Sequence, residues 1–180
     1  MKIVNKSRLL AALCLLLLIP IVTLQSAVAQ EERPVLAEPL ISLQEANAII
    51  ERAVAFSRER NMVMAVVVVD TAGNVVSSSR MDGASFRNMH YAEGKAFASV
   101  ITGRTSEDLG ALADTRPDRY FGMMNMYPGK VYLAGGGVPL SVDGTLVGAV
   151  GVSGLPQGID EMASRAGMAG WETFRESGRE

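Results

Sequence analysis

The sequence has 180 residues, 48% of them hydrophobic, with 17 Lys and Arg residues against 19 Asp and Glu residues, and this length fits one domain. Lys2, Lys6 and Arg8 precede the first acidic residue, Glu31, so the remaining chain carries 14 basic and 19 acidic residues, a net charge of −5. Such an acidic domain is not expected to bind nucleic acid or an anionic membrane surface, because both need clustered positive charge. The only cysteine, Cys14, lies in the leading segment, which excludes a disulfide, a thiol nucleophile and a thiolate metal site from the rest of the chain.

The first 29 residues have the order of a secretory signal peptide. The basic residues are followed by an uncharged, leucine-rich run from Leu9 to Leu24, and then by Ala27 and Ala29, whose small side chains suit a signal peptidase. An uncleaved anchor is the alternative, because the run approaches the roughly 20 residues that span a bilayer. Pro20 and the small residues favour cleavage. We therefore predict a signal peptide at residues 1–29 and a periplasmic or secreted protein with no membrane association after cleavage.

The segments that follow predict a leader, a helix and a hairpin. Residues 30–40 contain two prolines and three glutamates and predict a flexible leader. Ser42 and Glu45 form a capping-box pattern, and apolar residues recur behind it at helical spacing. The continuous apolar run from Met64 to Val69 predicts a strand covered on both faces or placed at an oligomer interface. A turn then leads into a second strand from Val75 to Met81.

The rest of the domain is predicted to hold three helices and a second hairpin. Gly103 is expected to close the first of these helices, Ser106 to cap the second, and residues 114–130 to form a loop with short turns. The predicted bounds are 86–101, 106–113 and 156–176 for the helices, and 138–142 and 145–152 for the hairpin strands. Together these elements predict a single α+β domain over residues 41–176, with a tail at 177–180. Its expected architecture is profilin- or PAS-like and layered, a mostly antiparallel five-stranded sheet flanked by helices.

Two of the predicted strands offer surfaces for self-association. One is the valine-rich run at residues 64–69. The other is the last strand, where Gly148, Gly151 and Gly154 recur at three-residue spacing and permit the close approach of a helix or a neighbouring subunit. We therefore expect a homo-oligomer.

Short motifs follow one another through the domain in a fixed order. They are Val69-Asp70 with Gly73, Arg80-Met81-Asp82-Gly83-Ala84, Gly94-Lys95-Ala96, Gly136-Gly137-Val138-Pro139, the run Gly148 to Gly154, and Asp160-Glu161. As an ordered set over about Ile41 to Phe174, they resemble the GlcG/HbpS-type haem-binding (haem-degrading) domain. The resemblance implies a small, oligomeric, layered domain that is sometimes secreted. It also implies haem binding in some members, and in others a place beside glycolate metabolism with no settled activity.

His90 is the only histidine, so a metal site with two histidines cannot form within one chain. On the predicted helix it shares a face with Gly94, Phe97 and Ile101. Gly94 in mid-helix costs roughly 1 kcal/mol relative to alanine, and the missing side chain would let a flat ring approach the backbone. Imidazole is a competent haem-iron ligand, so His90 is the candidate metal ligand. An interfacial or partly exposed structural histidine is the alternative.

Charged residues near this helix are candidates for contacts with haem propionates or with another carboxylate. Arginine offers a planar fork for such a contact and lysine a point charge. For Arg80 the alternative is a pairing with Asp82 or a role in capping a turn. The predicted ligand-binding residues are His90, Arg80, Asp82, Lys95 and Gly94, with haem as the expected cofactor.

The sequence thus predicts an extracytoplasmic protein that binds haem or another tetrapyrrole as a carrier, a buffer or a sensor accessory. One alternative is an enzyme that degrades haem or acts on a small organic acid, with Arg80, Lys95 and Asp82 lining the pocket. It lacks an evident nucleophile or acid–base pair. The other alternative is a structural oligomerisation module without a ligand.

Overall fold

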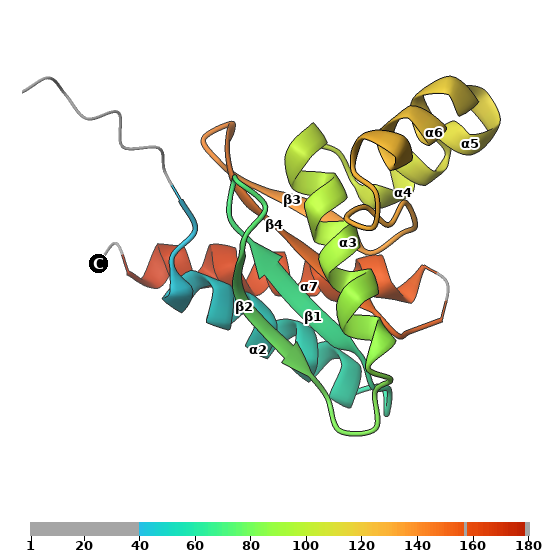
Figure 1. Ribbon diagram of the computed structural model, residues 1–180. Helices are drawn as coiled ribbons and strands as arrows, with labels where there is room; N and C mark the ends of the chain where they lie inside the picture. The colour runs from blue at the N-terminus through green and yellow to red at the C-terminus, as the bar shows by residue number, and fades with distance from the viewer. Residues whose placement is uncertain (1–39, 157, 179–180) are drawn as a thin grey trace, which may run out of the picture. The chain divides into compact units, whose positions relative to one another are not determined.

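The computed structural model describes residues 40–156 and 158–178 (Figure 1). Within these residues the elements are, in chain order, α2 (Leu43–Arg58), β1 (Ala65–Val69), β2 (Val75–Arg80), α3 (Arg87–Thr102), α4 (Ser106–Gly110), α5 (Leu112–Thr115), α6 (Pro117–Met126), β3 (Gly137–Val142), β4 (Thr145–Ser153) and α7 (Ile159–Ser177). The predicted signal peptide and residues 30–39 of the predicted leader lie outside them. None of the described helices is long and apolar enough to cross a membrane.

The sheet has the strand order β2-β1-β4-β3, and every neighbouring pair is antiparallel. The described residues therefore form the predicted α+β domain, but with four strands, and the prediction of five was wrong. The apolar residues 131–134, which precede β3, belong to no strand. The backbone N–H of Tyr132 instead donates to the carbonyl of Gly94 on α3, at 3.1 Å. The Tyr132 N–H, which would bond a neighbouring strand in a sheet, is therefore bonded to a carbonyl of helix α3.

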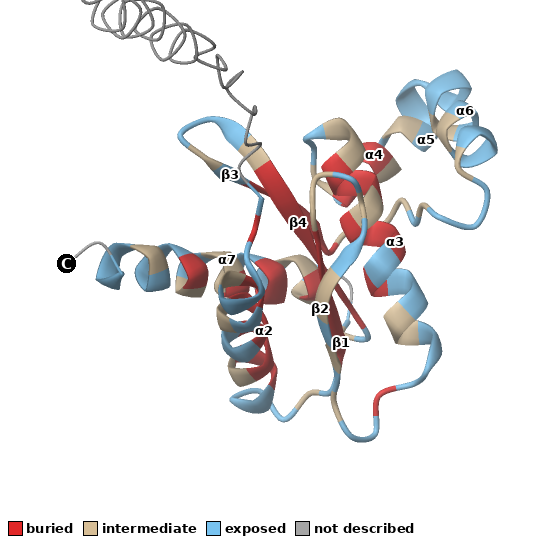
Figure 2. Cartoon of the chain, turned by 60° about the vertical axis from the view of Figure 1, so that its left-hand side comes forward, coloured by how far each residue is buried: buried red, intermediate tan, exposed pale blue. Residues whose placement is uncertain are grey.

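The central strand β1 is buried on both faces, as the continuous apolar run predicts. Val66 and Val68 belong to the core beneath α2 and α7, whereas Val67 and Val69 belong to the core beneath α3. Figure 1 shows α3 on one side of the sheet and α2 and α7 on the other. Figure 2 shows the resulting burial of β1 and β4. These strands lie inside the protomer, so the surfaces on which the oligomer prediction rested are already covered.

The predicted capping box begins α2. The Ser42 hydroxyl accepts a hydrogen bond from the Glu45 N–H (3.2 Å), and the Glu45 carboxylate accepts one from the Ser42 N–H (2.9 Å). The Glu45 carboxylate also accepts hydrogen bonds from Trp171 Nε1 (3.1 Å) and Arg175 Nη1 (3.0 Å) on α7. One side chain therefore caps α2 and joins it to α7.

The region between α3 and β3 departs from the prediction. Gly103 closes α3 with φ +66°, as expected, but the N-cap of α4 is Thr105, whose hydroxyl accepts from the Asp108 N–H (3.1 Å), and not Ser106. Residues 117–126 form the helix α6 where a loop was predicted. Pro117 is compatible with a helix because it occupies the first turn, where its missing N–H would have no partner. Neither α5 nor α6 buries a residue (Figure 2).

Glycines in the sheet let α3 lie close to it. A Cβ atom added at Gly151 would meet Ala92 O and Ala96 N, and one added at Gly137 would meet Lys95 O. The contact at Gly151 confirms that this glycine of the last strand admits a helix, whereas a Cβ atom added at Gly148 would meet Val69 O of β1. The contacts at Gly151 and Gly137 fix the height of α3 above β3 and β4, and thereby the position of every side chain that α3 carries.

Candidate functional site

The helix α3 carries the predicted ligand residues on two different sides. Five positions separate His90 from Lys95, which places them about 140° apart around the helix axis. His90 is exposed, whereas only 3% of the Lys95 side chain is accessible. The two residues therefore belong to different environments and line two different clefts.

The first of these, the His90 cleft, has a volume of about 400 Å³. Its walls are the turn between β1 and β2, one side of α3 and the segment after α6, and they comprise Gly73, Asn74, Val75, His90, Glu93, Gly94, Phe97, Gly129 and Lys130. His90, Gly94 and Phe97 share this wall, which confirms the helix face predicted from their spacing. The cleft combines an imidazole, an aromatic ring and an ammonium group within one chain.

The turn that forms the opposite wall is fixed by Asp70. Its Oδ1 accepts hydrogen bonds from the N–H groups of Ala72 (2.9 Å) and Asn74 (2.8 Å). Gly73 has φ +82°, and a Cβ atom there would lie 2.6 Å from two atoms of the Phe97 ring. A glycine at this position therefore lets the aromatic ring of α3 pack against the turn. The Lys130 Nζ lies 5.7 Å from the centre of the same ring.

The space beside the Gly94 Cα is filled by the chain itself. A Cβ atom added at Gly94 would lie 2.9 Å from Tyr132 Cβ and 3.0 Å from Tyr132 N. The expectation that a flat ligand would approach the backbone here was therefore wrong in its geometry. Gly94 lines the His90 cleft, but its missing side chain accommodates residue 132.

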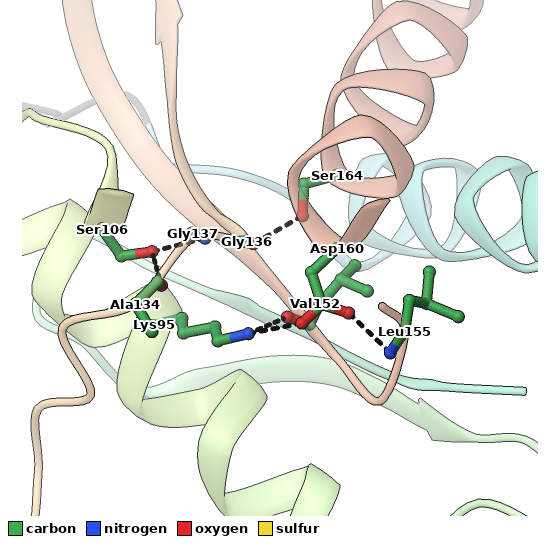
Figure 3. A network of polar contacts seen from close by, with 9 residues as sticks. All are labelled: Lys95, Ser106, Ala134, Gly136, Gly137, Val152, Leu155, Asp160 and Ser164. Carbon is green, nitrogen blue, oxygen red and sulfur yellow. Dashed lines mark hydrogen bonds and ion pairs between the residues drawn. The ribbon is translucent and has the colours of Figure 1, made fainter. Parts of the chain in front are cut away.

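Lys95 forms the most deeply buried ion pair of the described residues (Figure 3). Its Nζ lies 2.7 Å from Asp160 Oδ2 on α7 and donates to Val152 O at 3.0 Å. The other oxygen of Asp160 accepts from the Leu155 N–H at 2.9 Å. Burial raises the pKa of Asp160 above its ordinary value, and the bonds from Lys95 and from the Leu155 N–H offset this only in part.

Two buried serines hold the segment before β3 next to this ion pair (Figure 3). The Ser106 hydroxyl donates to Ala134 O (2.6 Å) and accepts from the Gly137 N–H (2.7 Å). The Ser164 hydroxyl on α7 donates to Gly136 O (2.6 Å). α4, α7 and the loop are thereby fixed around Lys95.

The Lys95 cleft opens on this side of α3 and has a volume of about 690 Å³. It is lined by residues of α3, α4, the segment 132–135 and the loop from β4 to α7, among them Arg87, Asn88, Tyr91, Lys95, Glu107, Tyr132, Ser153, Gly154, Leu155, Gly158 and Asp160. The rings of Tyr91 and Tyr132 stack, with centres 4.5 Å apart and planes at 18°. The cleft therefore contains the Lys95–Asp160 ion pair, and the two stacked tyrosine rings form an aromatic wall.

The remaining predicted residues lie outside both clefts. Arg80 is exposed at the end of β2, and its Nη1 donates to Ala84 O at 2.6 Å, the turn-capping role that was the alternative for this residue. Asp82 is exposed in the turn between these two residues. The structure therefore does not bring Arg80, Lys95 and Asp82 together in one pocket.

Asp160 is the residue that the sequence reasoning missed. Its place in the first turn of a helix is explained by the helix dipole alone, so it gives no sign of a partner 65 positions earlier in the chain. The available signal was Lys95 itself. A lysine between Gly94 and Ala96, within the apolar stripe of a helix, requires a buried acceptor.

Comparison with known proteins assigns this small α+β domain, in which helix α3 lines two clefts, to a known protein family. Residues 41–169 match the family described as "Haem degrading protein HbpS-like". The match covers most of the chain, and the protein belongs to this HbpS-like family.

Individual relatives agree with this assignment. Protein GlcG of Escherichia coli K12 is 28% identical over 114 residues, which is 63% of this chain and 81% of GlcG. A double mutant of HbpS from Streptomyces reticuli has a TM-score of 0.65 and 30% identity, covering 72% of this chain and 86% of that one. The structure titled as a PduOC–haem complex has a TM-score of 0.66 and 25% identity, covering 73% and 94%.

Proposed function

We propose that this protein binds haem in the His90 cleft, with the imidazole of His90 as the axial ligand of the iron. The observation that carries the proposal is that the only histidine of the sequence is exposed in a cleft beside an aromatic ring and a lysine. Membership in the HbpS-like family and the similarity to PduOC, which has been crystallised with haem, support the choice of ligand.

The residues of the cleft fit haem better than a bare metal ion. No group of three His, Cys, Asp or Glu side chains in the described part of the chain is placed to hold a metal ion. Haem brings four nitrogen ligands of its own, so a single imidazole would suffice as the ligand that the protein supplies. Bound haem would supply the ligand-exchange and redox chemistry of its iron at this site.

The neighbours of His90 have separate roles in holding such a group. Phe97 and Val75 supply apolar surface for the porphyrin, and the exposed Lys130 supplies a cation for a propionate. Glu93 lies one helical turn from His90 in the same cleft and is positioned to accept the second ring N–H, which orients the imidazole.

Haemin titration of the protein without its first 29 residues tests this proposal. We expect a saturable Soret shift at one haem per chain, weakened about tenfold or more in His90→Ala. Arg87→Ala is the matched control, because Arg87 is exposed on the same helix but lines the Lys95 cleft. Absence of a saturable shift would rule out haem binding. An equal shift in both variants would remove His90 as the ligand.

The proposed setting is outside the cytoplasm, where the protein acts as a haem carrier, buffer or sensor accessory. The signal-peptide pattern of residues 1–29 supports this. Mass spectrometry of the full-length protein expressed in an export-competent host tests it. We expect a periplasmic product that starts at Gln30, and an uncleaved product in the cytoplasm or membrane would contradict the proposed location.

A further inference from the structure

The Lys95 cleft is separate from the proposed haem site. Some of its hydrogen-bond donors have no acceptor among the described residues. Lys95 is almost wholly buried, and an ion pair of this kind often stabilises a fold no better than apolar residues of similar size. A lysine ammonium has three protons to donate. Among the described residues, Val152 O and Asp160 Oδ2 accept two of them, and the third has no acceptor although Lys95 lines the cleft.

Both oxygens of the buried carboxylate beside Lys95 already accept hydrogen bonds. One Asp160 oxygen bonds Lys95 and the other bonds the Leu155 N–H. The neighbouring carboxyl of Glu161 raises the pKa of Glu107, so the carboxyl of Glu107 holds a proton more readily than an ordinary glutamate.

The donors of the cleft remain available. Arg87 is exposed at the rim and forms no ion pair with any described residue. Gly158 begins α7 without a side-chain cap, so the positive end of the helix dipole lies in the wall of the cleft. A cleft that contains a buried ammonium with one proton to spare, a guanidinium without an ion pair and the start of a helix is suited to an anion.

The aromatic wall limits the shape of that anion. Tyr91 and Tyr132 stack on each other, remain 36% and 40% exposed and both line the cleft, so the pair offers aromatic surface to a ligand there. Flat rings pack on such a surface with an offset stacking geometry. Gly154, Leu155 and Gly158 of the loop between β4 and α7 also line the cleft. From this geometry we propose that the Lys95 cleft is a second ligand site, which binds a small carboxylate with a planar, conjugated body.

In this site the carboxylate accepts hydrogen bonds from Lys95 and Arg87, and the planar body lies on the tyrosine wall. No bond is made or broken, and the proposal is one of binding only. The site does not depend on haem, because the His90 cleft shares none of these donors.

Calorimetric titration with benzoate, benzamide and cyclohexanecarboxylate tests the proposal. Benzamide keeps the planar ring and lacks the charge, whereas cyclohexanecarboxylate keeps the charge and lacks the plane. We expect saturable benzoate binding, and affinity about tenfold lower for benzamide, because hydrogen bonds to a charged group are lost. Equal binding of benzoate and benzamide, or no saturable binding of benzoate, would overturn the proposal.

Variants locate the binding. Arg87→Gln should weaken benzoate about tenfold, whereas Lys130→Met in the other cleft should leave it unchanged. The double variant Lys95→Met with Asp160→Leu replaces the ion pair by apolar residues and is expected to fold without binding benzoate. Haemin should neither compete with benzoate nor be displaced by it. Competition, or equal benzoate affinity in Arg87→Gln and Lys130→Met, would contradict a separate site at Lys95.

Discussion

The two clefts beside α3 differ in how their charged groups are satisfied. On one side, Lys95 is 3% exposed and meets a carboxylate from α7 and a carbonyl from β4. On the other side, His90 and Lys130 are exposed, and no ion pair of the described residues includes either. One side of α3 therefore carries a charge that the fold requires, and the cleft on the other side holds groups that no described residue pairs with. Substitutions on the two sides should separate stability from binding.

The largest expected effect comes from replacing each lysine by methionine. Lys95→Met leaves Asp160 buried without its partner, and we expect a loss of about 3–5 kcal/mol in the free energy of unfolding. Lys130→Met removes an exposed charge and should change this free energy by less than about 0.5 kcal/mol. Urea denaturation followed by the fluorescence of the sole tryptophan, Trp171, measures both. Similar losses in the two variants would mean that the two sides of α3 do not differ in this way.

A second pair of variants tests whether the sheet sets the height of α3. Gly151→Ala places a methyl group against Ala92 O and Ala96 N, and we expect a loss of about 1–3 kcal/mol through overpacking. Gly122→Ala is the control in the exposed helix α6, where no atom lies within 4 Å of the added Cβ. It should stabilise by about 0.5–1 kcal/mol, because alanine favours a helix. Equal effects in thermal unfolding would contradict the proposed packing constraint.

Glu45 tests stability at a place remote from both clefts. Burial would raise the pKa of Glu45, but hydrogen bonds from Ser42 and Trp171 and the charge of Arg175 outweigh it and lower the pKa below its ordinary value of 4.5. A lowered pKa in the folded state means that the ionised carboxylate stabilises the protein above about pH 4.5 and that this stabilisation is lost as the pH falls through the folded-state pKa.

Glu45→Gln should therefore cost about 1–2 kcal/mol at neutral pH, and the difference from the wild type should shrink in acid. Glu51→Gln, on an exposed part of α2, is the matched control and should be neutral. Unfolding by urea at several pH values measures the difference. A cost that does not change with pH would contradict the role given to the Glu45 charge.

The smallest expected effect is that of Lys130→Met on haem affinity. An exposed ion pair with a propionate contributes about 0.2–1 kcal/mol, which corresponds to a loss of about 1.4- to fivefold in affinity. Raising the ionic strength should reduce the difference in haem affinity between the wild type and Lys130→Met, because salt screens exposed charges. Haemin titration at low and high salt measures this. An unchanged affinity at low salt would mean that Lys130 does not contact the ligand.

Much of the fold followed from local patterns in the sequence. The capping box at Ser42, the valine run of β1 and the second hairpin each depend on neighbouring residues, and each was predicted. The prediction of a fifth strand was wrong because of a tertiary contact, in which the Tyr132 N–H binds the carbonyl of Gly94 on α3. The loop predicted over residues 114–130 was wrong for a local reason, since Pro117 is compatible with the first turn of a helix and α6 begins there without burying a residue.

The candidate site was predictable only in part. Helical spacing correctly grouped His90, Gly94 and Phe97 on one wall. It did not separate Lys95 from them, because sequence proximity suggested a common site where the turn of the helix gives two. The pairing of Lys95 with Asp160 joins residues 65 positions apart, and no local pattern encodes such a contact.

Chemical rescue tests most directly the central claim, that His90 binds the iron of haem. His90→Gly should lose the Soret band of the haem-loaded protein, and free imidazole should restore it, because the ligand returns to the space that the side chain vacated. Haemin with imidazole in the absence of protein provides the reference spectrum. The account predicts a restored, protein-bound spectrum that matches the wild type. A variant that gives the wild-type spectrum without added imidazole would contradict it.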